Sequence, residues 1–90
     1  MDFEWDDAKD RSNQKKHGLS FQDAQLAFFD PYRVVLADAK HSAGERRYFC
    51  IGLVNGLVAT VRYTIREERI RIIGAGYWRS GKRIYYWEDT

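Results

Sequence analysis

The sequence predicts an α+β domain in which two N-terminal helices pack on one face of a four-stranded antiparallel sheet, followed by a short C-terminal helix or strand. Helix-capping signals occupy the first 30 residues, and runs rich in β-branched and aromatic residues begin at Tyr32. Between two of these runs, Asn55-Gly56 supplies the positive φ angles of a tight hairpin turn. A length of 90 residues suits one domain spanning residues 1–90.

The first predicted helix begins at an N-cap, either Asp6 or Asp7, and runs through Lys16 to a left-handed Gly18. Its last turn carries three basic residues: Lys15, Lys16 and His17. Cations stabilise the negative end of a helix dipole, so this cluster has a structural explanation as well as a functional one.

The second predicted helix opens with Ser20 and Asp23, which have the spacing of a capping box. Its apolar residues share one helical face: Phe21, Ala24 and Phe28. Asp30-Pro31 then ends the helix, because a residue before proline is driven out of the helical region.

Four strands are predicted next, over residues 32–38, 46–54, 57–65 and 69–75, with a polar loop at 39–44 and a charged turn at 66–68. Glycines interrupt the pattern after the fourth strand. Residues 82–88 fit a short strand or a short helix, and the pattern does not decide between them.

The turn at Asn55-Gly56 sets the strand register. It places six residues on one face as cross-strand pairs: Phe49 with Arg62, Ile51 with Thr60, and Leu53 with Val58. If the turn at 66–68 has an even number of residues, Arg62 and Thr64 point the same way as Arg69 and Arg71. That face is then basic at one end and apolar at the other, where Leu53, Val58 and Ile73 lie. The opposite face is apolar and should pack under the helices: Tyr48, Cys50, Ala59, Val61, Tyr63, Ile70 and Ile72.

Charge is divided unevenly along the chain. Residues 1–45 hold six Lys and Arg against nine Asp and Glu, whereas residues 46–90 hold nine against four. A basic second half suits an anionic ligand, with nucleic acid first among the candidates, and an ordinary solvated surface is the alternative that charge alone leaves open. Clustered arginines on neighbouring strands also indicate a bound anion, unless Glu45, Glu67 or Glu68 pairs with them.

Several classes are excluded by what the sequence lacks. No apolar run approaches the roughly 20 residues of a membrane span, and the N-terminus is acidic where a signal peptide is basic. We therefore expect a cytoplasmic protein without membrane contact, and the single cysteine, Cys50, fits a reducing compartment. Two histidines and Cys50 lack paired ligand spacing, so we expect no metal and no other cofactor.

An ordered set of motifs runs along the chain to Ala75: Phe3-Glu4-Trp5-Asp6, Lys16-His17-Gly18 with Ser20-Phe21, Asp30-Pro31, Asp38 with His41, Glu45-Arg46-Arg47, Gly52, Tyr63-Thr64 with Arg66, and Arg69-Ile70-Arg71-Ile72-Ile73. This succession resembles the BrnT toxins. The resemblance implies the toxin of a bacterial type II toxin-antitoxin pair, with a RelE-like fold and a ribonuclease activity that blocks translation. It also implies a BrnA-type antitoxin, which is a ribbon-helix-helix protein. Only the antitoxin would contact operator DNA in the complex.

One departure from the family pattern lies after the fourth strand. Many members read Ile-Ser-Ala-Arg where this chain reads Ile73-Gly74-Ala75-Gly76, followed by Tyr77-Trp78-Arg79. Either Arg79 replaces the missing arginine or activity is altered or lost. The alternative to an enzyme is therefore a degenerate toxin or nucleic-acid-binding module that only binds its antitoxin.

Metal-free RNA cleavage needs a base for the 2′-hydroxyl, positive charge for the phosphorane and an acid for the leaving oxygen. We predict Arg62 and Arg71 as phosphate-holding catalytic residues, and His17 and His41 as acid and base, because histidine ordinarily titrates near neutrality. Further cations are predicted to bind RNA: Lys16, Arg66, Arg69, Arg79, Lys82 and Arg83. Four apolar residues are hard to cover in so short a chain and are predicted to contact the antitoxin: Leu53, Val58, Ile73 and Trp78.

Overall fold

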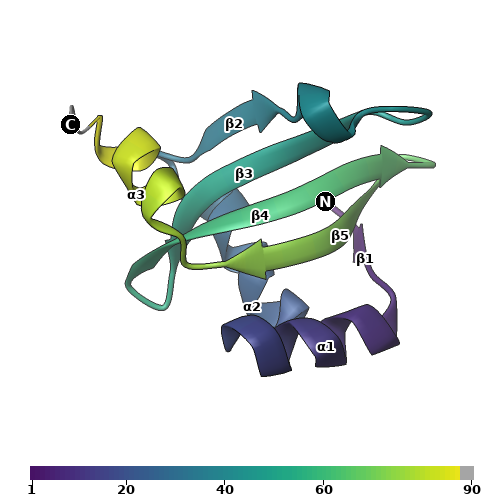
Figure 1. Ribbon diagram of the computed structural model, residues 1–90, viewed down its shortest axis with the longest axis horizontal. Helices are drawn as coiled ribbons and strands as arrows, with labels where there is room; N and C mark the ends of the chain where they lie inside the picture. The colour runs from purple at the N-terminus through teal and green to yellow at the C-terminus, as the bar shows by residue number, and fades with distance from the viewer. Residues whose placement is uncertain (88–90) are drawn as a thin grey trace.

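The protein, seen in a computed structural model that describes residues 1–87, is a single sheet with helices against both of its faces (Figure 1). In spatial order the strands are β1 (Phe3–Glu4), β5 (Arg69–Gly76), β4 (Leu57–Arg66), β3 (Arg47–Val54) and β2 (Val34–Ala37). The helical segments are α1 (Asp7–His17), α2 (Phe21–Ala24), α3 (Arg79–Tyr86) and the 3-10 helices η1 (Gln25–Phe29) and η2 (Ala39–His41). The α+β class is confirmed.

The predicted four-stranded antiparallel sheet is wrong in one respect, because β1 adds a fifth strand that runs parallel to β5. Phe3 pairs with Ile70 and Glu4 with Arg71, and the Ile70 N–H donates to the Asp2 carbonyl at 2.9 Å. A strand of two residues is too short to show alternation in the sequence. The paired residues are 67 positions apart along the chain, so only the tertiary fold reveals the strand.

Both N-terminal helix starts are confirmed. The Asp6 carboxylate accepts from the Lys9 N–H at 3.0 Å, and the Ser20 hydroxyl accepts from the Asp23 N–H at 3.0 Å. Gly18 ends α1 with φ 66°. The second helix is α-helical only over α2 and tightens into η1 before Asp30.

The predicted register of the β3–β4 hairpin is confirmed at all three pairs. The following turn has two residues, Glu67 and Glu68, both with positive φ, so Arg62 and Thr64 share a face with Arg69 and Arg71 as expected. One irregularity changes the pattern further along, because Tyr63 pairs with Ile72 while Arg62 pairs with Gly74. Ile73 is the extra residue, and Gly74 lies beside Arg62 in its place.

The helix-covered face carries the core, as predicted. Cys50, Val61 and Tyr63 are buried there against Phe21 and Phe28. Burial raises the pKa of the Cys50 thiol and of the Tyr63 hydroxyl to about 12 in each case, which removes both from acid-base chemistry near neutrality.

The C-terminal element is a helix, α3, and it covers part of the second face. Its Gly81 lies directly on Thr60 and Ile51, and a Cβ there would stand 2.0 Å from the Thr60 hydroxyl oxygen. Val58, at the apolar end of this face, is only 7% exposed, which corrects the expectation that this end stays open. Glu88, the last residue of the predicted segment, lies outside the described residues. No helix within residues 1–87 has the length and apolar character to cross a membrane.

The Asp30 carboxylate joins three segments that are distant in sequence. It is 7% exposed and accepts the Tyr32 and Leu53 N–H groups at 2.8 Å each, and it also accepts the Tyr85 hydroxyl from α3. Burial alone would raise the pKa of Asp30, but the Tyr85 and backbone hydrogen bonds and the charge of Arg33 outweigh it and lower the pKa below its ordinary value. The same hydrogen bond raises the pKa of Tyr85 to about 12.

Asp30 should therefore make the protein sensitive to acid. A carboxyl group whose pKa is lower when folded stabilises the fold above its unfolded pKa, and that stability disappears as the pH falls through the folded value. Asp30→Asn should lower the free energy of unfolding at pH 7 by about 1–3 kcal/mol and flatten its dependence on pH below about 4. Urea unfolding at pH 7, 5 and 3 measures both, with exposed Asp2→Asn as the matched control. An Asp30→Asn protein as stable and as acid-sensitive as the unmodified chain would refute this role.

Candidate active site

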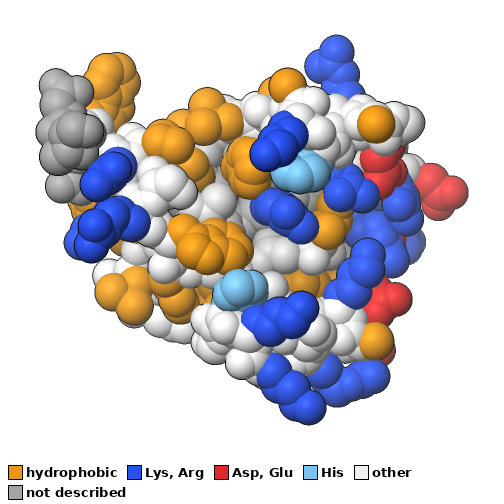
Figure 2. Space-filling model, in the orientation of Figure 1, with side chains coloured by type: hydrophobic (Ala, Val, Ile, Leu, Met, Phe, Trp, Pro, Cys, Tyr) orange, Lys and Arg blue, Asp and Glu red, His pale blue; other side chains and the backbone are white. Residues whose placement is uncertain are grey.

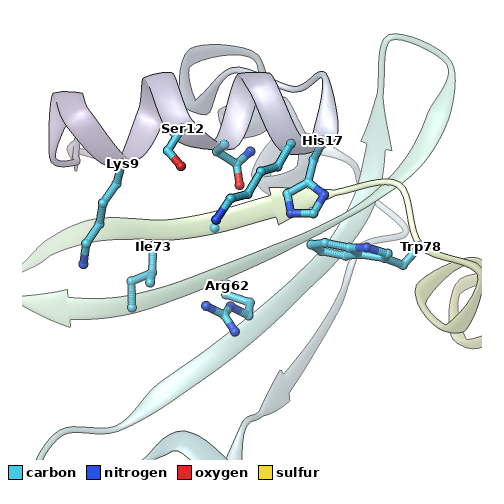
Figure 3. Close-up of a pocket in the computed structure, with 9 residues that line it drawn as sticks. Lys9, Ser12, His17, Arg62, Ile73 and Trp78 are labelled. Atoms are coloured by element: carbon cyan, nitrogen blue, oxygen red, sulfur yellow. The ribbon is translucent and has the colours of Figure 1, made fainter.

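A pocket of about 300 Å³ lies between α1 and the adjoining strands β4 and β5 (Figure 3). We call it the α1–β5 pocket. Its lining residues are Lys9, Ser12, Asn13, Lys16, His17, Arg62, Ile73, Gly74 and Trp78. Three of the residues predicted to handle RNA, Lys16, His17 and Arg62, come together here.

One face of α1 supplies five of these residues. Lys9, Ser12 and Lys16 lie three and four positions apart, as do Asn13 and His17, so all five project from one side of the helix. Lys9, Ser12 and Asn13 were not predicted as site residues. Their spacing relative to Lys16 and His17 was the signal that could have identified them.

The Asn13 side chain holds α1 against β5. It is 8% exposed, and its Nδ2 donates to the Leu19 carbonyl at 2.8 Å and the Ala75 carbonyl at 2.9 Å. Its Oδ1 accepts the Ala75 N–H at 3.2 Å. One amide thus satisfies both backbone groups of Ala75 and fixes the spacing between the helix and the strand that border the pocket.

Two glycines in β5 form the floor beneath Arg62 and Trp78. A Cβ on Gly74 would lie 3.5 Å from Nε of Arg62, and a Cβ on Gly76 would lie 2.6 Å from the indole ring of Trp78. The Gly76 contact is closer than any side chain allows, so only glycine permits the indole to rest on the strand there. Trp78 therefore fills the space directly beside Gly76.

His17 projects from the end of α1 toward this indole. Its ring meets Trp78 edge to face, with the ring centroids 5.0 Å apart and the planes at 72°. In Figure 3, His17 and Trp78 stand at one end of the pocket and Lys9 at the other, and the Arg62 side chain on β4 lies between these two ends. The aromatic contact orients an imidazole that remains exposed to solvent.

Arg62 differs from the other predicted strand arginines in its charge partners. Arg71 and Arg69 both pair with Glu4, at 3.0 and 3.7 Å, and Arg66 makes two hydrogen bonds of 3.2 Å to Glu45, lowering the pKa of that carboxyl. Of the three carboxylates expected to pair with these arginines, Glu45 alone does so within residues 1–87. The pairing with Glu4 of β1 was not predicted. Within residues 1–87, Arg62 has no carboxylate within 4.0 Å.

The pocket lining therefore combines Lys9, Lys16 and Arg62 with an imidazole and, in the part of the chain that the structure describes, contains no carboxylate. Uncompensated cations at close range favour an anion between them. Guanidinium and ammonium groups at one site are suited to a phosphodiester in particular. Among residues 1–87, no three His, Cys, Asp or Glu side chains gather where they could hold a metal ion.

The remaining predicted residues lie elsewhere. Arg71 is engaged by Glu4, and His41 sits on η2, with Nδ1 3.0 Å from Asp38 Oδ2. Neither lines the α1–β5 pocket, although Figure 2 shows histidine on both sides of the exposed sheet face, with Lys and Arg around it. Arg79 and Lys82 line a neighbouring hollow, Arg83 is exposed on α3, and Leu53 is 37% exposed.

Comparison with known proteins adds the family. A family model described as the ribonuclease toxin BrnT of type II toxin-antitoxin systems matches residues 5–81. The matched range includes every residue that lines the α1–β5 pocket. No curated protein matches the chain.

Removing the Asn13 amide should loosen the pocket. Asn13→Ala leaves the buried Ala75 and Leu19 groups without this partner, so it should lower the free energy of unfolding by about 1–3 kcal/mol. Hydrogen exchange at the Ala75 amide should accelerate more than exchange in β3. Urea unfolding and amide exchange by NMR measure these effects, with its exposed neighbour Gln14→Ala as control. Unchanged exchange at Ala75 would show that Asn13 does not hold the strand.

Proposed function

The chain belongs to the BrnT family of ribonuclease toxins of type II toxin-antitoxin systems, and we propose that its α1–β5 pocket is the site at which RNA is cleaved. The observation that carries this proposal is Arg62, a guanidinium without a carboxylate partner among residues 1–87, beside Lys16 and His17. We further propose that the fold is RelE-like and that the enzyme is an endoribonuclease acting in the cytoplasm.

The reaction proposed is attack of a ribose 2′-oxygen on the adjacent phosphorus. The new bond is O2′–P and the broken bond is P–O5′, which yields a 2′,3′-cyclic phosphate and a free 5′-hydroxyl. Two proton transfers accompany it: one leaves the 2′-hydroxyl and one reaches the departing 5′-oxygen. No step needs a metal ion, because positive charge for the phosphorane comes from side chains.

We assign these roles to the residues of the pocket. Arg62 holds the phosphate with parallel N–H donors, and Lys16 and Lys9 add positive charge that is most valuable when the phosphorane develops. His17, oriented by Trp78, moves a proton at the reacting centre. Arg71 pairs with Glu4 and His41 pairs with Asp38. We propose that these two residues bind RNA away from the scissile bond and do not contact the reacting atoms.

RNA is proposed to extend from the pocket across the basic surface. Arg66 and Arg69 lie at one end of β4 and β5, and Arg79, Lys82 and Arg83 belong to α3 at the other. Each would contact phosphate as a point of positive charge and add to the salt dependence of binding.

The antitoxin required by a type II system is proposed to be a BrnA-type ribbon-helix-helix protein. Free toxin is proposed to block translation by destroying RNA, and operator DNA would be bound only through the antitoxin. The proposed antitoxin contacts are Leu53, Val58, Ile73 and Trp78. Leu53 and Trp78 are 37% and 39% exposed, whereas Val58 is only 7% exposed.

A second candidate function is a toxin that has lost cleavage and only binds its antitoxin. The observation in its favour is Gly76, where the family pattern has arginine and where this chain places the Trp78 ring. Arg79 does not line the α1–β5 pocket, so it does not supply a guanidinium there. The two candidates predict different effects on growth and on RNA when the chain is produced alone.

Production of this chain alone in bacteria should arrest growth and deplete messenger RNA, and production together with the neighbouring antitoxin should restore growth. Purified toxin should cleave RNA equally well in the presence of EDTA, since the proposed reaction uses no metal ion. RNA length profiles and growth curves measure these outcomes. Normal growth at confirmed expression of folded protein would favour the non-enzymatic candidate.

Arg62→Ala should reduce RNA cleavage by about 100-fold or more, as expected when a donor to transition-state charge is removed. Arg62→Lys keeps the charge but loses the planar fork, so it should stay substantially impaired. Arg11→Ala, an exposed arginine of α1 outside the pocket, is the matched control and should retain cleavage. Full activity in both Arg62 variants, with stability unchanged, would move the active site away from the pocket.

A further inference from the structure

A second hollow adjoins the α1–β5 pocket. It measures about 390 Å³ and lies between the tip of the β3–β4 hairpin and α3. We call it the hairpin groove, and its lining residues are Gly56, Leu57, Val58, Tyr77, Trp78, Arg79, Lys82 and Tyr86. Trp78 lines both hollows, so its indole is the wall that they share.

The two hollows differ in chemistry. Three aromatic residues and two aliphatic ones line the hairpin groove, whereas the lining of the α1–β5 pocket is mainly polar and includes three cations. Leu57 is 58% exposed and Tyr86 is 53% exposed, so these walls face solvent instead of filling the core. Arg79 and Lys82 also line the groove, and no carboxylate from residues 1–87 is among the lining residues.

We propose that the hairpin groove is a nucleobase subsite that receives an unpaired base next to the phosphate held in the α1–β5 pocket, so that the substrate is single-stranded RNA. This inference rests on the proposed function. A nucleotide offers an anionic phosphate and a flat, largely apolar base joined through one sugar. The adjoining hollows offer a cationic site and an aromatic site separated by one side chain, in the same order.

Charge and size both favour a base in the groove. Arg79 and Lys82 complement the phosphates on either side of a bound nucleotide, and the groove volume lies within the range of small-ligand sites. Aromatic walls can stack on any base. A base in a duplex is already stacked and paired, so the groove selects for strand state more than for sequence.

Trp78 acquires a positioning role from this arrangement. A base against the groove side of the indole, with His17 in contact with the same ring, would place the ribose between the groove and the imidazole. The subsite would thereby orient the 2′-hydroxyl without touching the reacting atoms. Because Trp78 also borders the active site, it is unsuitable as the test residue, and Tyr86 is chosen instead.

The test measures binding with probes that cannot be cleaved. A short 2′-O-methyl RNA strand of mixed sequence, the same strand in a duplex, and a backbone of equal length without bases are titrated against the full chain and its variants. Tyr86→Ala should weaken binding of the single strand by about 5- to 140-fold, the equivalent of the roughly 1–3 kcal/mol of stacking one base. It should barely change binding of the baseless backbone. Tyr32→Ala, which removes a 79% exposed tyrosine outside the groove, is the matched control.

The outcomes separate this inference from the proposed function. Selective loss of base-dependent affinity in Tyr86→Ala supports the subsite even if the unmodified chain fails to cleave RNA. Equal affinity of the chain for strand and baseless backbone overturns it, even if cleavage is confirmed. It is also overturned if a correctly folded Tyr86→Ala protein binds RNA normally and loses only its antitoxin. Leu57→Ser, a second groove variant with a side chain at the hairpin tip, should reproduce the Tyr86→Ala result.

Discussion

The amide of Asn13 is the interaction on which the site depends, because it sets how far α1 stands from β5. Its three hydrogen bonds satisfy backbone groups that the helix and strand would otherwise leave buried and unpaired. This contact positions the α1 side chains that line the α1–β5 pocket, including Lys16 and His17. Asp30 has a corresponding role on another strand, where it links α3 to β3.

Local signals in the sequence predicted most of the fold. The caps at Asp6 and Ser20 and the turn at Asn55-Gly56 depend on hydrogen bonds and φ angles within a few residues, so sequence alone was sufficient. Features that depend on distant residues were missed. Examples are β1, which exists only through pairing with β5, and the extra residue Ile73, which alternation cannot reveal.

In the candidate site, too, residues could be predicted from local signals, but contacts between distant residues could not. Arg62, His17 and Lys16 were identified from residue type and strand parity, but their meeting in one pocket follows from the seating of α1. Arg71 satisfied the same parity rule and yet faces Glu4, because the partner carboxylate comes from β1. Parity determines which face a side chain occupies, whereas ion pairs determine which charges on that face stay free for a ligand.

The contact between Gly76 and Trp78 limits which substitutions the chain can accept at these two positions. Any side chain at position 76 would displace the indole, which in turn would open both the wall beside His17 and the wall of the hairpin groove. A side chain at position 76 is therefore compatible only with a moved or smaller residue at 78, and a chain with a large residue at 76 must build this part of its surface from another side chain. Two architectures of the site then exclude each other, and substituting one residue at a time passes through an intermediate with neither.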